Sequence, residues 1–148
     1  MNKKGFTIIE LMATLAIMSI IMVIGTYSLM GLNKAMKKDL WTSKEKLIER
    51  AAVKYGEDHK NILKKKSCAS GKQKCMEIKV QTLINRGYLA TKEYEKGEDG
   101  KFITDEHHNK IKTITNDTLD PSDPNYYINQ TEVRIYIEKG YVYAKYNE

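Results

Sequence analysis

The sequence predicts an α+β fold, in which one long N-terminal helix packs against a small antiparallel β-sheet that ends in a C-terminal hairpin. Two observations lead to this prediction. A charge-free apolar run at residues 11–32 continues without proline into an amphipathic segment. Near the other end of the chain, apolar and polar residues alternate on both sides of a short glycine-containing turn. With 148 residues, the chain has room for the long helix and one small domain.

The apolar run is the first element. Its 22 residues would form a helix of roughly 33 Å, enough to cross the hydrocarbon core of a bilayer. A secretory signal has a shorter apolar region, of about 7–15 residues, so we expect this segment to remain in the mature protein. Lys3 and Lys4 precede the run, but further lysines follow it at 34, 37 and 38. The positive-inside rule therefore decides little about orientation.

The residues before the run form a recognisable pattern. The segment Lys3-Lys4-Gly5-Phe6-Thr7-Ile8-Ile9-Glu10-Leu11-Met12 resembles the prepilin cleavage and methylation motif of type IV pilins and type II secretion pseudopilins. The resemblance implies that a membrane-embedded prepilin peptidase removes a leader, residues 1–5, by cutting between Gly5 and Phe6 on the cytoplasmic side. It also implies methylation of the new Phe6 amine, and a single-pass topology with the N-terminus inside. Many major pilins have a proline midway along this helix, and here only Gly25 and Gly31 could weaken it.

Glu10 has a physical reason to matter for assembly. A charge in the apolar helix needs a partner, although near the membrane edge it could also reach the interface or become protonated. In a stack of such helices, Glu10 of one subunit can meet the Phe6 amine of a neighbour, and this pair would be strong in a low dielectric. Removing one partner of a buried pair typically costs about 3–5 kcal/mol. The predicted assembly charge pair is therefore Glu10 with Phe6.

Beyond the apolar run the helix becomes amphipathic. We predict one helix from about Thr7 to His59, with residues 6–32 as its transmembrane and assembly half and residues 33–59 as its amphipathic half. The residues expected to form the buried stripe of this helix are Met36, Leu40, Leu47, Ile48, Ala51, Ala52 and Tyr55. Trp41 is expected to fill a core or an interface. Residues 60–148 then form the globular head.

Residues 60–74 are rich in lysine and are predicted to form an exposed loop. Cys68 and Cys75 flank a glycine-containing stretch of this loop, and an oxidising compartment would allow them to form a disulfide. The net charge of +6 comes mostly from lysine and could attract nucleic acid, anionic lipid or a wall polymer, or could simply be a solvated surface. Aromatic residues that would stack on single-stranded nucleic acid are absent from this loop.

The rest of the head is predicted from short patterns. Residues 77–89 suggest a short helix over Val80, Leu83 and Ile84 that ends at Gly87, and this segment is similar to one found in many Gram-positive pilin-like proteins. Residues 93–109 suggest a polar loop that could include a strand at 101–104. A strand is expected at 111–114, and residues 131–137 and 141–146 are expected to form the C-terminal hairpin.

No catalytic group, cofactor motif or metal motif stands out, so the chain is not expected to be an enzyme. His107 and His108 would point to opposite faces of a strand and so are not expected to share a metal. Asp117, Asp120 and Asp123 could bind calcium, but turn chemistry explains them equally well.

The sequence is therefore most consistent with a type IV pilin-like filament subunit of the cytoplasmic membrane that is later assembled into an extracellular pilus or surface filament. The expected partners are the prepilin peptidase, other pilin subunits, the assembly platform with its ATPase, and membrane lipid. One alternative is a minor pilin or pseudopilin of a DNA-uptake or type II secretion system. Another is an anchored protein that binds wall polymer or nucleic acid and never polymerises. Adhesion, motility, secretion and DNA uptake are not distinguished.

Overall fold

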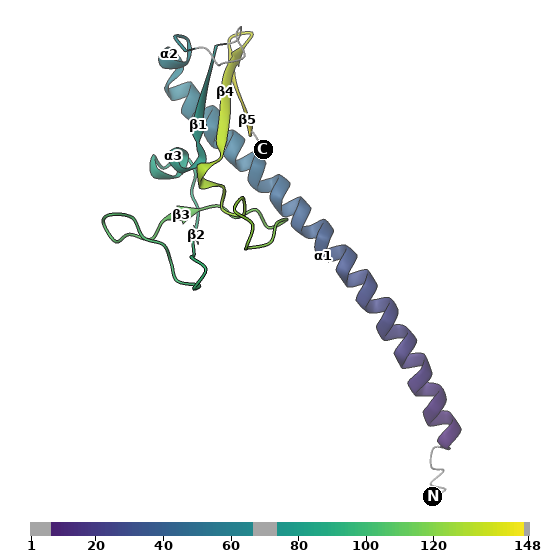
Figure 1. The fold of residues 1–148 in the computed structure, drawn as a ribbon. Coiled ribbons are helices and arrows are strands. Elements are labelled where there is room, and N and C mark those ends of the chain that lie inside the picture. Colours follow the sequence, from purple (N-terminus) through teal and green to yellow (C-terminus); the bar gives the residue numbers. More distant parts are fainter. Residues whose placement is uncertain (1–6, 67–73, 147–148) are drawn as a thin grey trace, which may run out of the picture. The chain divides into compact units, whose positions relative to one another are not determined.

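The computed structural model describes residues 7–66 and 74–146, apart from the side chains of residues 27–30. It confirms the α+β class, with a long helix α1 at Ile8–Asp58 and a small antiparallel sheet (Figure 1). The chain divides into two compact units, Met1–Lys38 and Asp39–Glu148, and α1 contributes residues to both. The second unit is the head.

The other elements of the head are short. They are α2 (Lys60–Leu63), β1 (Cys75–Lys79), α3 (Val80–Asn85), β2 (Glu93–Tyr94), β3 (Lys112–Thr113), the 3-10 turn η1 (Ile128–Gln130), β4 (Glu132–Glu138) and β5 (Tyr141–Tyr146). Three strands form the main sheet in the order β1-β4-β5, and β2 pairs with β3 in a two-stranded ribbon. All of these pairings are antiparallel.

The C-terminal hairpin is confirmed. β4 and β5 are joined by Lys139 and Gly140, whose φ values of 49° and 87° are those of a tight two-residue hairpin turn. Val133 and Ile135 point into the core and are fully buried, as the alternation predicts. β1 pairs with the other edge of β4, which places Cys75 opposite Tyr136.

The head packs its sheet against the part of α1 that belongs to the same unit (Figure 1). Ile48 and Ala52 are fully buried there, and the Trp41 ring meets the Tyr146 ring edge to face with centroids 5.7 Å apart. Gly56 lies against two side chains of the sheet, because a Cβ at this position would be 2.6 Å from Ile135 Cγ2 and 2.7 Å from Val142 Cγ1. A glycine is needed where side chains of the sheet come this close to the helix backbone.

The predicted buried stripe of α1 is confirmed for its last four residues, from Ile48 to Tyr55, and is wrong for its first three. Met36, Leu40 and Leu47 are 60%, 50% and 54% exposed, whereas Trp41 is buried together with Ile48 and the residues one and two turns further on. The prediction followed the apolar residues forward from the membrane-spanning run. The sheet instead covers the face centred on Trp41, Ile48 and Ala52, so the face that is buried depends on the partner and not on apolar character alone.

Three further predictions about the head needed correction. Residues 60–63, predicted as loop, form α2, because Leu63 is fully buried while the lysines at 64, 65 and 66 stay exposed. β1 was not predicted, because its pairing with β4 is far away in sequence. The optional strand at 101–104 is reduced to two isolated bridges, Lys96 with Phe102 and Thr104 with Lys110. The short helix and its glycine end are confirmed by α3 and by a φ of 77° at Gly87.

Candidate functional site

The first turn of α1 holds the carboxylate that the sequence singled out. Thr7 precedes the helix, and the Leu11 N–H donates to the Thr7 carbonyl at 3.2 Å. Glu10 Oε2 accepts hydrogen bonds from the Thr7 N–H at 3.0 Å and from the Thr7 hydroxyl at 2.9 Å. The Glu10 N–H returns a bond to Thr7 Oγ1 at 3.4 Å. Thr7-Ile8-Ile9-Glu10 is therefore a reciprocal capping box.

This cap changes the prediction about Glu10. The carboxylate already has a partner in its own chain, and its negative charge lies at the positive end of the helix dipole. Sequence reasoning missed Thr7, although the pattern of a threonine followed three residues later by a glutamate was available to find it. Both Thr7 bonds end on Oε2, so Oε1 is the oxygen not used by the cap.

The helix that follows the cap is apolar on all sides. Its large apolar side chains from Ile8 to Ile24 are each at least 56% exposed in the single chain. The segment has a mean hydropathy of 2.4 in its most apolar window and passes the length and composition test for a membrane span, a test that a signal sequence near an N-terminus also passes. Such a surface is stable in lipid or against other apolar helices, and it is unfavourable in water.

A family model described as the prokaryotic N-terminal methylation motif matches residues 1–26. This match supports the assignment of the chain to the type IV pilin and pseudopilin family. The motif and the long apolar helix are together consistent with membrane anchoring followed by a place in a surface pilus. No curated protein and no solved structure matches the chain.

Several of the predicted site residues lie outside the described residues. These are Gly5, Phe6 and Cys68. Cleavage, methylation and the charge pair with a neighbour therefore stay predictions. Cys75 is described, and it is 4% exposed at the start of β1. Its predicted disulfide with Cys68 also stays a prediction.

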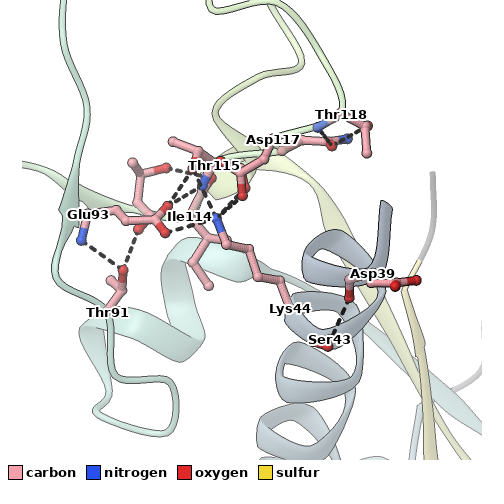
Figure 2. Close-up of polar contacts among 11 residues, drawn as sticks. Asp39, Ser43, Lys44, Thr91, Glu93, Ile114, Thr115, Asp117 and Thr118 are labelled. Carbon is pink, nitrogen blue, oxygen red and sulfur yellow. Dashed lines mark hydrogen bonds and ion pairs between the residues drawn. The ribbon is translucent and has the colours of Figure 1, made fainter. Parts of the chain in front are cut away.

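A second polar cluster lies in the head and was not predicted (Figure 2). Lys44 Nζ lies 2.6 Å from Asp117 Oδ2 and 2.9 Å from Glu93 Oε1. It also donates to the carbonyl and the hydroxyl of Thr115, at 3.0 and 3.1 Å. Glu93 Oε2 in turn accepts from the Thr115 N–H at 2.6 Å and from its hydroxyl at 2.7 Å.

The Lys44 side chain is only 14% exposed in this cluster. Desolvation by burial lowers the pKa of its amine, but the hydrogen bonds and charges of Asp117 and Glu93 outweigh desolvation and raise the pKa overall. The ammonium therefore stays protonated and connects α1 to the segments around β2 and β3. The cluster is a structural link within the head, because its donors and acceptors bind one another.

The acidic residues considered for calcium have other partners. Asp117 binds Lys44, while Asp120 and Asp123 accept hydrogen bonds from Ser122 and Asn125 within their own turns. In the part of the chain that the structure describes, no three potential metal ligands come together. Turn chemistry accounts for Asp120 and Asp123.

Proposed function

We propose that the protein is a type IV pilin-like filament subunit, which is held in the membrane by its N-terminal helix and then assembled through that helix. The observation that carries this proposal is the methylation motif at residues 1–26, joined to an apolar helix whose large side chains are exposed among the described residues. The role is structural, with no reaction catalysed and no cofactor bound. The partners would be the prepilin peptidase, other pilin subunits, membrane lipid, and the assembly platform with its ATPase.

The proposed maturation begins between Gly5 and Phe6. The peptidase would cut this bond on the cytoplasmic side, leaving a positive Phe6 amine at the head of the apolar helix. The head would lie outside the membrane. Glycine at the cut presents no side chain to obstruct the peptidase, and Lys3 and Lys4 would hold the bond at the interface.

The capping box refines the proposed docking step. Thr7 holds Glu10 through Oε2, so we assign Oε1 to the Phe6 amine of a neighbouring subunit. Thr7 would then act as a positioning residue that fixes the carboxylate before the neighbour arrives. A charge pair formed among apolar helices is stronger than the same pair in water.

Maturation is tested by mass spectrometry of the protein purified from its own cells. We expect the mature chain to begin at a methylated Phe6. A Gly5→Leu variant should keep its leader, since a branched side chain would obstruct the cut, and it serves as the uncleaved control. Retention of Met1 in the wild-type protein would contradict the proposal at its first step.

Assembly is tested with two substitutions of the same residue. Glu10→Ala removes both the cap and the charge, whereas Glu10→Gln keeps an oxygen for Thr7 and removes the charge alone. We expect both variants to insert in the membrane and to be lost from sheared filaments by about 100-fold or more, as expected for stranding one partner of a buried pair. Glu57→Ala, at an exposed glutamate of the same helix, is the matched control and should assemble normally. Normal incorporation of Glu10→Gln would exclude the charge pair.

Two narrower roles share the same motif. A minor pilin or pseudopilin of a DNA-uptake or type II secretion system would be rare in sheared filaments, and a major pilin would dominate them. A membrane-anchored protein that binds wall polymer or nucleic acid through the exposed lysines at 64, 65 and 66 would be absent from filaments altogether. The protein's abundance in the sheared fraction therefore distinguishes the three roles.

A further inference from the structure

The main sheet of the head leaves one edge of β5 without a neighbouring strand. Among the described strands, β5 pairs with β4 alone, and Figure 1 shows β4 between β5 and β1. An unpaired edge presents backbone N–H and C=O groups that can pair with another chain, so natural proteins usually protect such edges. Nothing in the assembly mechanism above uses this edge.

The register of the hairpin identifies the backbone groups that point away from β4. In an antiparallel pair, opposite residues alternate between pairs that exchange two hydrogen bonds and pairs that exchange none. Glu138 and Tyr141 close the two-residue turn as a bonded pair, so Ala144 belongs to a pair that exchanges none. The Tyr146 N–H fits this alternation, because it donates to Glu49 Oε1 of α1 at 3.2 Å. The N–H and C=O of Ala144 therefore point outward, and neither has a hydrogen-bond partner among the described residues.

Side chains cover both ends of this edge, but its middle opens into a groove. At the turn, the Gly140 carbonyl accepts a hydrogen bond from Lys60 Nζ at 2.8 Å, and at the other end Glu49 covers the N–H of Tyr146. Between these ends, Ala144 is partly exposed and lines an open groove of about 310 Å³ between β5 and α1. An extended chain in this groove could exchange both backbone hydrogen bonds with Ala144, as in strand addition to a sheet edge.

The groove lining favours one kind of extended chain. Val53 and Ala144 contribute apolar surface. Lys46 and Arg50 are exposed on α1, and neither has an ion-pair partner among the described residues. The acidic residue of the lining, Glu49, already accepts a hydrogen bond from β5. A second copy of this groove would bring like charges together, whereas an acidic segment would be attracted to it.

We propose that the open edge of β5 binds an extended acidic peptide, which adds a strand to the main sheet. One peptide residue would accept from the Ala144 N–H and donate to the Ala144 carbonyl. The apolar side chains of the peptide would pack on Val53, and its carboxylates would pair with Lys46 and Arg50. A nucleic acid would also be attracted to these two cations, but its phosphates have no donor for the Ala144 carbonyl. The proposal does not rest on filament assembly.

The test uses the full-length chain as a monomer in detergent, so that a failure to polymerise and a failure to bind are separate results. The probe is a fluorescently labelled, end-blocked peptide in which glutamate and valine alternate. One control peptide of the same length has lysine in place of glutamate, and another has proline at its central positions, where it cannot donate a backbone hydrogen bond. Fluorescence anisotropy should give saturable binding of the glutamate peptide and at least about tenfold weaker binding of both controls.

Two variants of the groove separate its backbone contacts from its charge. Ala144→Pro removes the outward N–H without removing a hydrogen bond to β4, and proline is tolerated at such edge positions. We expect it to bind the glutamate peptide about tenfold more weakly, with little change in the thermal unfolding midpoint. Arg50→Glu should also weaken binding about tenfold, and it provides the test if Ala144→Pro does not fold. Lys92→Glu makes the same charge change at an exposed residue outside the groove and should bind like the wild type.

Several results would overturn the proposal. They are absent or non-saturable binding of the glutamate peptide, equal binding of either control peptide, and unchanged binding by both Ala144→Pro and Arg50→Glu. A single-stranded oligothymidylate of about twelve nucleotides tests the other polyanion. If it bound the wild type more tightly than the glutamate peptide does, and bound Ala144→Pro equally well, the groove would be a nucleic-acid site instead.

Discussion

The two parts of α1 have the same secondary structure and opposite surroundings. In the first unit Ile17 is 59% exposed, and in the head Ile48 is fully buried beneath the sheet. The first part is therefore a helix whose stability depends on lipid or on other apolar helices, while the second is part of a folded core. The comparison shows that one continuous helix can serve two environments when, among the described residues, only one of its parts is packed into a core.

The largest effect should come from a matched pair of isoleucine truncations. Ile48→Ala removes a fully buried side chain and should lower the free energy of unfolding of the head by about 2–5 kcal/mol. Ile17→Ala should leave it unchanged, because its side chain contacts no core. The single tryptophan, Trp41, is buried in the head, so its fluorescence during denaturant unfolding in detergent reports on this unit. Equal effects of the two changes would remove the distinction between the two parts.

The predicted disulfide should affect the head by a smaller amount. Closing a loop of about eight residues between Cys68 and Cys75 stabilises by roughly 2.5 kcal/mol in the chain-entropy model. Reductant should therefore lower the unfolding midpoint of the wild type and leave that of Cys68→Ser unchanged. Alkylation followed by mass spectrometry gives an independent result, since two free thiols in protein from an oxidising compartment would contradict the pairing.

Glycines along α1 provide the next comparison. Gly56→Ala places a methyl group against Ile135 and Val142 and should destabilise the head by about 1–3 kcal/mol. A Cβ at Gly31 meets nothing within 4 Å, so Gly31→Ala should instead favour the helix by about 0.5–1 kcal/mol. Circular dichroism reports the helix content, and tryptophan fluorescence reports the unfolding of the head. The two measurements together therefore separate the effects of Gly31→Ala and Gly56→Ala. A neutral Gly56→Ala would mean that helix and sheet can separate at this point without cost.

The features that could be predicted from the sequence are those with a local pattern. The β4-β5 hairpin follows from alternation around Lys139 and Gly140, and the end of α3 follows from Gly87. The Thr7 cap also has a local signature, because a threonine is followed three residues later by a glutamate at the start of an apolar run.

The features that could not be predicted depend on contacts between distant residues. β1 pairs with a strand more than fifty residues later, and Lys44 meets Asp117 across 73 positions. The first part of the buried stripe of α1 was misplaced for the same reason, because Leu40 and Trp41 are both apolar and only the position of the sheet decides between them.

The smallest expected effect concerns Lys44 in the head. Lys44→Met leaves Glu93 and Asp117 without their cation in a half-buried site, and we expect a loss of about 1–2 kcal/mol at neutral pH. Lys101→Met is the matched control, because the Lys101–Asp99 pair is 85% and 57% exposed and should contribute less than about 0.5 kcal/mol.

The direction in which the contribution of Lys44 to the unfolding free energy changes with pH provides a second test. The folded state raises the pKa of Lys44, so its stabilisation is fully present below the ordinary lysine value and is lost as the pH rises through the folded-state pKa. The difference in unfolding free energy between wild type and Lys44→Met should therefore be constant from neutral to mildly alkaline pH and shrink above that range. Other lysines and tyrosines titrate there too, but they are common to both proteins and cancel in the difference. A difference that grew with pH would mean that the amine is stabilised in its neutral form. That result would contradict an ionic link between Lys44 and the two carboxylates.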